Sequence, residues 1–451
     1  MRAITLTEYQ TLEKAEAQVL DDEDQSKRLG AECFDQLLEK LTGNVNNALE
    51  QRFFKVIPSK TTRGFAIQAN NYVGFYKISD RSALEILPKV YSETDLSLEE
   101  QRRLLLKMLA AIYHLNVTNI ENVNLGQMAN VPLLEIFITL FLNQVEYLCN
   151  RGLRADYQDI EENEPFLRGR LLIKDNLRLN MFNHARFYCK YQIFSENRPE
   201  NRLLLSALLK VSALSSSQEN IRLSAKLLPN FSQVAESTNF YHDMQQWQRG
   251  PEMAAYQQLE SWCQLLLNCH PTLSSGELSA NSIMFPMERL FEAYVQATFK
   301  RTFNVDAHRV FDNSELTNTT TYLASWQNNE RPLDENCDVF VLKPDILVKN
   351  EEQTVMILDA KWKLLDENER RLNIKESDVY QMLAYAYAFK PISGNLCLIF
   401  PKFERFQQPV MFKFNNSADQ PEYRVRVIPF DLATDEFIGI TDWRELVALD
   451  H

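Results

Sequence analysis

Glycine is scarce in this sequence, with 11 among 451 residues. Neither a Gly-x-x-x-x-Gly-Lys-Ser/Thr motif nor a Gly-x-Gly-x-x-Gly motif occurs. Loops of these kinds bring backbone N–H groups close to the phosphates of a bound nucleotide. We therefore expect this chain neither to hold a nucleotide tightly nor to hydrolyse one by itself.

The cysteines are few and dispersed, and no pair among the seven has the spacing of a zinc site. Cys263, Cys269 and His270 come nearest, and we expect them to lie in a buried helix. An odd, scattered set of thiols is typical of a reducing compartment. This predicts a cytoplasmic protein.

Long apolar runs are missing, because no stretch of about twenty apolar residues exists. The longest candidate, from Val131 to Leu148, is interrupted by charged and amide side chains, which predicts an amphipathic helix. The N-terminus, Met1-Arg2-Ala3-Ile4-Thr5, lacks the apolar core of a signal peptide. We therefore expect no membrane partner.

A basic excess is missing as well, because the formal net charge is −13. Proteins that bind nucleic acid unaided usually carry a basic surface that displaces counterions from the phosphates. Two acidic runs, at residues 21–24 and 156–164, contribute to this charge, and we expect them to be solvated faces or linkers. Most affinity for any nucleic acid is therefore expected to come from a partner.

Length and patterning predict an α+β multidomain protein in three parts. Residues 1–125 are expected to form a mixed α/β module, and residues 126–280 a mostly helical region. Residues 281–451 are expected to form a mixed sheet flanked by helices. Two capping boxes predict helix starts, one at Thr7 with Gln10 and one at Ser97 with Glu100.

Hydrophobic periodicity predicts the remaining elements. Strands are expected at residues 53–57, 64–69, 73–78, 83–87, 396–400, 410–414 and 423–429, with strand-like pieces near 168–170 and 187–193. Helices of the middle part are expected at residues 131–149, 201–214, 218–228 and 253–267. The helix after Ser97 carries its apolar side chains on one face, which predicts the buried side: Leu104, Leu105, Met108, Leu109 and Ile112.

The most informative pattern joins Lys343-Pro344-Asp345 to Asp359-Ala360-Lys361. A strand is expected to run from residues 339–341 into 346–348, and a second strand leads into the second triplet. The polar residues 349–353 favour a hairpin turn, which places Asp345 opposite Asp359. Side chains alternate along a strand, so Asp359 and Lys361 share one face. Two carboxylates and an ammonium group at one point favour a divalent cation beside a positioned lysine.

Two helices are predicted around this hairpin. Ser377 is expected to N-cap a helix that ends near Phe389 and places Gln381 and Tyr385 on one face. Pro286 favours the start of an earlier helix. The apolar stripe of this helix consists of Leu290, Phe291, Tyr294 and Val295. Glu292 flanks the stripe and is the candidate acidic residue of the site, and Glu288, one helical turn earlier, competes with it for that role.

This order of helix, hairpin and helix resembles the core of PD-(D/E)xK nucleases, and the Gln-x-x-x-Tyr helix resembles the branch that includes RecB-like nucleases. A narrower resemblance is to the McrC family, the nuclease subunits of McrBC modification-dependent restriction systems. It rests on residues 285–295, 358–363 and 378–386, and on two upstream segments, 84–90 and 166–171. Together these segments cover the chain from roughly residue 70 to residue 400.

The resemblance implies a Mg²⁺-dependent endonuclease, with Mn²⁺ as a substitute, that cleaves DNA carrying modified, methylated-cytosine type bases. Lys361, beside two carboxylates, is expected to stay protonated and to orient the attacking water. The implied metal ligands are Glu292, Asp345, Asp359 and the carbonyl group of Ala360. The implied catalytic residues are Asp345, Asp359, Lys361, Gln381 and Tyr385.

The resemblance also implies a partner, an McrB-like AAA+ GTPase hexamer that binds the GTP, reads modified double-stranded DNA and is stimulated by this chain. Residues 1–125 would then dock on the partner, and dimerisation through residues 281–451 stays open. Candidates to act on the partner's nucleotide are Arg63, Arg81, Arg168 and Arg170. Candidates to guide DNA beside the hairpin are Lys361, Lys363, Arg370, Arg371 and Lys375.

Each motif also has an ordinary structural explanation, since a lone Pro-Asp is usually a turn and a lone Asp-x-Lys is often a solvated strand edge. Two other classes therefore stay open. A stand-alone RecB-like repair nuclease would need its own grip on DNA, which the acidic net charge disfavours. A non-catalytic adaptor with a nuclease-like fold is disfavoured by the intact Asp345, Asp359 and Lys361.

Overall fold

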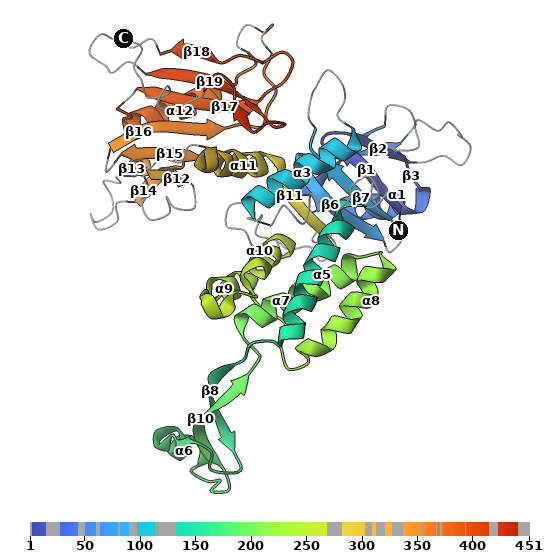
Figure 1. Cartoon of the computed structure of the whole chain (residues 1–451), viewed down its shortest axis with the longest axis vertical. Coiled ribbons are helices and arrows are strands. Elements are labelled where there is room, and N and C mark those ends of the chain that lie inside the picture. Colours follow the sequence, from blue (N-terminus) through green and yellow to red (C-terminus); the bar gives the residue numbers. More distant parts are fainter. Residues whose placement is uncertain are drawn as a thin grey trace. The chain divides into compact units, whose positions relative to one another are not determined.

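The computed structural model describes residues 2–14, 28–43, 50–59, 64–79, 82–89, 97–113, 115, 132–267, 282–302, 309–312, 321–326, 337–350, 353–366, 368–369, 372–392, 394–414 and 423–440. The chain divides into two compact units, Met1–Asn130 with His270–His451, and Val131–Cys269 (Figure 1). The division at residues 125 and 280 stays a prediction. The expectations for Arg63, Arg81, Cys269, His270, Arg370 and Arg371 lie outside the described residues.

The first unit begins with two sheets that share one apolar core. One sheet has the order β1 (Arg2–Thr7), β7 (Ser82–Leu87), β6 (Tyr72–Ser79) and β11 (Ser282–Pro286). The other has the order β3 (Arg28–Leu29), β2 (Thr11–Lys14), β5 (Phe65–Ala69) and β4 (Phe54–Pro58). Helix α1 (Ala31–Thr42) packs on this core through Phe34, Leu37 and Leu41, and the short helix α2 (Glu50–Phe53) precedes β4. The strands expected between residues 53 and 87 are confirmed.

The helix expected from Thr7 is wrong, because Thr7 ends β1 and the chain turns into β2. Leu6 on β1 and Leu12 on β2 are both buried in the core. The apolar residues of this segment therefore follow the two-residue repeat of strands and not the repeat of a helix. The Thr7 and Gln10 pairing is real but closes the turn: the backbone N–H of Thr7 donates to Gln10 Oε1 at 2.9 Å. A capping-box pattern therefore marks a turn here instead of a helix.

The helix expected after Ser97 is confirmed as α3 (Leu98–Ile112). Ser97 and Glu100 form both hydrogen bonds of the capping box, and the predicted apolar face is buried. Helix α3 contacts α11 (Met287–Thr302). Because α3 also contacts β7, it connects the N-terminal sheet with the helix that carries Glu292.

Strand β11 joins the two ends of the first unit, and it was not predicted. It pairs with β6 and runs directly into α11, so Pro286 is the last strand residue and the helix begins at Met287. Four residues of the expected stripe, Leu290, Phe291, Tyr294 and Val295, are buried, as predicted. The pairing fixes where α11 starts relative to the N-terminal sheet.

The main C-terminal sheet has the order β12 (Arg309–Asp312), β15 (Ile346–Asn350), β16 (Gln353–Ala360), β17 (Asn395–Pro401), β19 (Arg424–Asp431) and β18 (Val410–Lys413), with β20 (Glu436–Phe437) paired to β19. It is mixed, because β16, β17 and β19 run parallel while β15 and β18 run antiparallel to their neighbours. The expected late strands are confirmed.

The prediction of a single strand through residues 339–348 is wrong. Strand β14 (Cys337–Leu342) pairs with β13 (Thr321–Trp326) in a separate two-stranded sheet, and β15 begins only at Ile346. Pro344 has no N–H group to continue a ladder, and it restricts the residue before it. The break leaves the carbonyl group of Lys343 available to a side chain.

Helix α12 (Glu376–Phe389) packs its Met382, Tyr385 and Ala386 against the sheet face formed by residues such as Leu347 and Ile357. The predicted N-cap is wrong: the helix starts after Lys375, with no side-chain cap, and Ser377 is already helical. The predicted end is confirmed, since Lys390 adopts the left-handed conformation just before Pro391. Helix α11 contacts the opposite sheet face, where Phe291 meets Phe430.

The second unit is a helical group with a projecting β-arm (Figure 1). Its helices are α5 (Leu133–Arg151), α7 (Pro199–Leu214), α8 (Gln218–Leu227), α9 (Phe240–Gln245) and α10 (Gln257–Leu266), with 3-10 turns at Leu228–Phe231 and Pro251–Met253. The helix expected over 253–267 is thus shorter at its start. The arm pairs β8 (Asp156–Glu164) and β9 (Arg170–Leu171) with β10 (Phe187–Ser195) and carries α6 (Ile173–Asn180).

The acidic run at 156–164 is strand β8, which the sequence did not predict. Most of its side chains are exposed or half-buried, and antiparallel pairing to β10 places Lys190 next to Glu161 and Asp159. Cross-strand charge pairs therefore stabilise a strand whose composition is typical of a linker.

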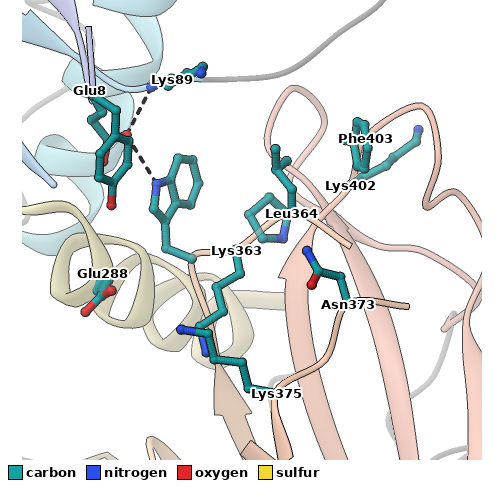
Figure 2. Close-up of a pocket in the computed structure, with 12 residues that line it drawn as sticks. Glu8, Lys89, Glu288, Lys363, Leu364, Asn373, Lys375, Lys402 and Phe403 are labelled. Atoms are coloured by element: carbon teal, nitrogen blue, oxygen red, sulfur yellow. Dashed lines mark hydrogen bonds between the residues drawn. The ribbon is translucent and has the colours of Figure 1, made fainter. Parts of the chain in front are cut away.

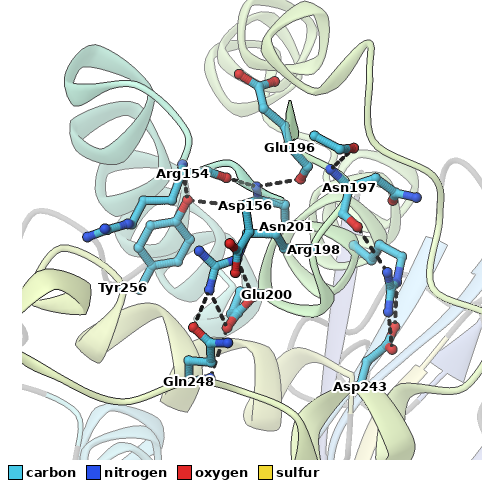
Figure 3. Close-up of polar contacts among 12 residues, drawn as sticks. Arg154, Asp156, Glu196, Asn197, Arg198, Glu200, Asn201, Asp243, Gln248 and Tyr256 are labelled. Carbon is cyan, nitrogen blue, oxygen red and sulfur yellow. Dashed lines mark hydrogen bonds and ion pairs between the residues drawn. The ribbon is translucent and has the colours of Figure 1, made fainter. Parts of the chain in front are cut away.

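A polar network holds the root of the arm on the helices (Figure 3). Asn201 on α7 donates to the carbonyl groups of Arg154 and Glu196, which precede β8 and follow β10. Tyr256 donates to Asn201 Oδ1 at 2.8 Å and accepts from the N–H of Arg154 at 2.9 Å. Because both ends of the arm are bonded to one buried asparagine, the arm is anchored at its base.

Across the ranges given above, no helix is both long and apolar enough to cross a membrane. Five cysteines whose side chains the structure describes are free thiols: Cys33, Cys149, Cys189, Cys263 and Cys397. Cys263 is buried in α10, as expected.

Gly74 is the position where the junction between β6 and β11 admits no side chain. Its φ is +131°, and a Cβ atom there would lie 2.1 Å from the carbonyl oxygen of Ile283. We predict that Gly74→Ala lowers the free energy of unfolding by about 1–3 kcal/mol, because the backbone of β11 must move. Chemical denaturation measures this. Gly64→Ala is the matched control, because nothing lies within 4 Å of its Cβ position; equal losses in both variants would contradict the account.

Candidate active site

The expected hairpin brings Asp345 and Asp359 together. Strands β15 and β16 are antiparallel with Ile346 opposite Leu358, so the residues one step further on, Asp345 and Asp359, face each other. The backbone N–H of Ala360 donates to Asp345 Oδ2 at 2.7 Å. One carboxylate oxygen of Asp345 is therefore fixed by the strand that carries Asp359.

Lys361 lies on the same face as Asp359, as predicted. Its Nζ is 2.7 Å from Asp359 Oδ2, and its backbone N–H donates to the carbonyl group of Ile399 on β17 at 2.8 Å. The backbone bond extends the β16 register by one residue beyond the strand. This bond holds the lysine side chain next to the two carboxyl groups.

Both aspartates are buried, with 5% of Asp345 and 1% of Asp359 exposed. Within the described part of the chain, neither oxygen of Asp359 has a hydrogen-bond donor in good geometry, so its contact with Lys361 is an ion pair. Buried carboxylate oxygens normally have donors, since leaving one without costs about 1–3 kcal/mol. Orphaned acidic oxygens beside a second acid are the arrangement that a cation would satisfy.

The electrostatics of the cluster follow from burial. Burial raises the pKa of Asp345 well above its usual range, and the charges of Asp359 and Glu292 raise it further. Burial also raises the pKa of Asp359, although Lys361 opposes that shift. For Lys361, burial alone would lower the pKa, but attraction to Asp359 outweighs it and the pKa is raised. Lys361 is therefore protonated, as expected.

Glu292, and not Glu288, faces the cluster. Burial raises the pKa of Glu292 to about 7, and this carboxyl group senses the charges of Lys361 and Asp359. Glu288 is exposed one turn earlier on α11 and lines a different cleft. The geometry thus separates two acids that the sequence left in competition.

Gln381 and Tyr385 are linked to the strand break before Asp345. Gln381 Nε2 donates to the hydroxyl group of Tyr385 at 2.7 Å, and that hydroxyl donates to the carbonyl group of Lys343 at 2.8 Å. Burial, with the nearby Asp359 and Asp345, raises the pKa of Tyr385 and keeps the phenol protonated. In this structure the pair holds the backbone that leads into Asp345.

Gln296 is a site residue that the sequence reading missed. It lies one helical turn after Glu292 on α11, and its Nε2 donates to the backbone carbonyl group of Asp345 at 2.9 Å. Its spacing of four from Glu292 places both side chains on one helix face, which is a signal that could have found it. Asp345 is therefore fixed through its carbonyl group as well as its carboxylate.

The expected basic residues are placed differently from one another. Lys363 forms a two-oxygen ion pair with Asp378 at 2.9 and 2.8 Å, and Lys375 is exposed at the start of α12. In the second unit, the guanidinium group of Arg168 stacks 4.3 Å from the Tyr191 ring centre, and Arg170 is exposed on β9. Lys363 is therefore partly neutralised while Lys375 is presented to solvent.

The residues fit a hard divalent cation. Two buried carboxylates, of which Asp359 has oxygens without hydrogen-bond donors among the described residues, and an adjacent backbone carbonyl are oxygen ligands of the kind that Mg²⁺ and Mn²⁺ prefer. As the side chains stand, no group of three or more His, Cys, Asp and Glu residues in the described segments closes around one point. The fit therefore rests on the aspartate pair, with Glu292 beside it.

Most of the chain matches a known protein family. Residues 67–401 match the model of a family described as McrBC 5-methylcytosine restriction system component. The protein is thus a restriction-system component, and the chain belongs to this McrBC family. The resemblance to McrC predicted from the sequence is confirmed.

Two relatives illustrate the match. The type IV methyl-directed restriction enzyme EcoKMcrBC of Escherichia coli K12 is 22% identical over 284 residues, which are 61% of this chain and 78% of that protein. A solved chain from the tetradecameric assembly of Thermococcus gammatolerans McrB AAA+ hexamers with bound McrC has a TM-score of 0.56 and 17% identity, with 95% of each chain covered. At that identity, the second match shows a shared fold.

The burial of Glu292 predicts a pH-dependent stability. Its carboxyl group has an ordinary pKa of 4.5 and a folded value of about 7, so the folded state binds more protons between these values. Its stabilising contribution is complete below pH 4.5 and is lost as the pH rises to about 7. We predict that Glu292→Gln removes this loss, which is at most about 3 kcal/mol.

Denaturant unfolding of the metal-free protein from pH 4 to pH 8 measures the effect. Glu288→Gln is the matched comparison, because it removes an exposed acid from the same helix whose charge adds only a small part of the rise in the pKa of Glu292, so it should change the pH slope far less. An unchanged pH slope in Glu292→Gln would contradict the burial of this carboxyl group in an acidic cluster.

Proposed function

We propose that this chain is the Mg²⁺-dependent endonuclease subunit of a McrBC-type restriction system and cleaves DNA with methylated-cytosine type modifications. The observation that carries the proposal is the buried pair of Asp345 and Asp359 with Lys361 in ion-pair contact. We further propose that α11, the β15–β16 hairpin, β17 and α12 correspond to a PD-(D/E)xK core. Membership of the McrBC family supports both proposals, and it favours a restriction-system nuclease over a repair nuclease that acts alone.

In the proposed mechanism, Asp345 and Asp359 would hold the metal with the carbonyl group of Ala360, and Glu292 lies beside them. A bound Mg²⁺ ion supplies Lewis-acid chemistry, withdrawing charge from a phosphoryl oxygen and lowering the pKa of water. The chain's own residues keep both carboxylates in place. The N–H of Ala360 and the amide of Gln296 do this for Asp345.

Lys361 is the proposed catalytic cation. Its ammonium group is held beside Asp359 and stays protonated, so it can donate hydrogen bonds to the attacking water and to a phosphoryl oxygen. Phosphodiester hydrolysis accumulates negative charge on these oxygens, and a fixed, partly buried cation stabilises it strongly. Gln381 and Tyr385 are assigned a positioning role through the carbonyl group of Lys343.

We propose that a GTP-hydrolysing AAA+ hexamer is the partner. The solved relative comes from an assembly of McrB AAA+ hexamers with bound McrC, which supports this choice. The arm of the second unit offers apolar side chains to a partner: Tyr157, Phe166, Leu167, Ile173, Leu177, Leu179, Met181, Phe182 and Phe194 are all at least half exposed. Such exposed apolar clusters are typical of protein-binding surfaces. The arm therefore joins residues 1–125 as a proposed docking region.

The catalytic assignment predicts that Asp359→Asn and Lys361→Ala each reduce cleavage of modified DNA by about 100-fold or more. Cleavage is measured with purified chain, partner, GTP and Mg²⁺, and excess EDTA should stop it. Near wild-type cutting by either variant would refute the site.

The same assay separates docking from chemistry. Asp359→Asn should still stimulate the partner's GTP hydrolysis, because it lies in the proposed metal site. Phe182→Ser, at a side chain that is 94% exposed on the arm, should weaken both GTPase stimulation and cleavage. If Phe182→Ser left both activities intact while Asp359→Asn abolished both, the proposed division between arm and nuclease core would be wrong.

A further inference from the structure

A separate cleft of about 350 Å³ lies in the first unit (Figure 2). It is formed by the turn after β1, the segment after β7, α11, and the segments that follow β16 and β17. Trp362, between Lys361 and Lys363, forms part of its wall. The cleft and the acidic cluster therefore share the same short segment of chain.

The wall of the cleft is aromatic and mostly cationic, with Glu8 and Glu288 as its acidic residues. Trp362, Tyr9 and Phe403 supply rings. The ammonium groups come from Lys89, Lys363, Lys375 and Lys402. Lys363 and Lys402 are each paired with an aspartate, whereas Lys375 makes no ion pair within the described ranges. Rings together with ammonium groups are the surface on which nucleic-acid bases stack and phosphates bind.

Glu8 supplies an independent feature that points to a ligand. Its side chain is 1% exposed, and its Oε2 accepts from the N–H of Lys89 at 3.0 Å and from the indole N–H of Trp362 at 3.2 Å. Its Oε1 has no hydrogen-bond partner among the described residues, although Glu8 lines the cleft. Burial raises the pKa of Glu8 to about 7, so above that pH the ionised carboxylate leaves Oε1 as a buried acceptor without a donor. This is costly, and a ligand N–H group in the cleft would satisfy it.

We infer that this cleft binds one nucleotide of the DNA strand that the neighbouring site cuts. The base lies against the rings of Trp362 and Phe403, and an exocyclic amino group donates to Glu8. The phosphate lies near Lys363 and Lys375. A carboxylate that accepts from an amino group reads cytosine in the same way in protein–DNA interfaces.

The inference rests on the proposed function for the identity of the strand, but not for the chemistry of the cleft. The shared chemistry is that of a nucleotide, either within a strand or free in solution. A strand is the favoured source, because Trp362 directly follows Lys361 of the proposed active site. A free mononucleotide is the competing source, and the experiment separates the two.

The test uses the full wild-type chain in EDTA, which prevents cleavage, at low salt. Fluorescence anisotropy compares dC and dT oligonucleotides of about eight residues. We expect dC to bind about tenfold more tightly, the scale of one base contact. Glu8→Gln should abolish or reverse this preference, because glutamine keeps an acceptor for Lys89 and Trp362 and presents an N–H group to the base.

Lys375→Ala should weaken the binding of both oligonucleotides equally. It should also reduce the slope of log affinity against log salt concentration by about 0.7, as expected for the loss of one phosphate contact on a single strand. Lys55→Ala, at an exposed lysine on β4 that does not line the cleft, is the matched control and should change nothing. A similar loss in both lysine variants would reduce the effect to net charge and overturn the assignment.

Three other results would overturn the inference. They are equal binding of dC and dT by the wild-type chain, a preference that survives Glu8→Gln, and dCMP that binds as tightly as the oligonucleotide. The proposed nuclease function would survive each of them, provided that the wild-type complex still cuts modified DNA. Conversely, a base preference that depends on Glu8, in a chain that never cuts DNA, would uphold nucleotide binding and refute the function.

Discussion

Burying two carboxyl groups next to each other is the constraint on which the rest of the C-terminal region depends. Asp345 and Asp359 would repel each other unless the surrounding structure held them, and among the described residues the oxygens of Asp359 have no hydrogen-bond donor. Lys361 holds them by its charge, Ala360 and Gln296 by hydrogen bonds, and Tyr385 through the backbone before Asp345. The repulsion that remains between the two buried carboxylates favours the binding of a cation. Residues that lower stability in this way are common at functional sites.

Contacts of the N-terminal module reach the candidate site at two points. Strand β11 pairs with β6 and passes directly into α11, which carries Glu292 and Gln296. Glu8, at the end of β1, bonds the indole of Trp362 between the two lysines of the β16 extension. The module is therefore part of the support of the site. A change in the N-terminal sheets has a short structural route to the residues that hold Asp345 and Asp359.

The local parts of the site could be predicted from the sequence, because they depend on short-range rules. Strand alternation and one polar turn place Asp359 beside Lys361 and opposite Asp345, and helical spacing joins Gln381 to Tyr385. Strand β11 and the Glu8–Trp362 bond escaped prediction, since each depends on a partner far away in the chain. Gln296 was missed although its spacing of four from Glu292 places it on the same helix face, and its bond to Asp345 appears only in the fold. Strand β8 escaped for another reason: its acidic composition is typical of a linker, and pairing to β10 stabilises it.

We propose that the aspartate pair binds a metal ion, and anomalous X-ray scattering from crystals soaked in Mn²⁺ locates such an ion. We expect a manganese peak between the carboxylates of Asp345 and Asp359, with oxygen ligands at about 2.1 to 2.2 Å. The peak should be absent from Asp359→Asn crystals. A complex that cleaves DNA in Mn²⁺ while its crystals hold the ion only elsewhere would contradict the account.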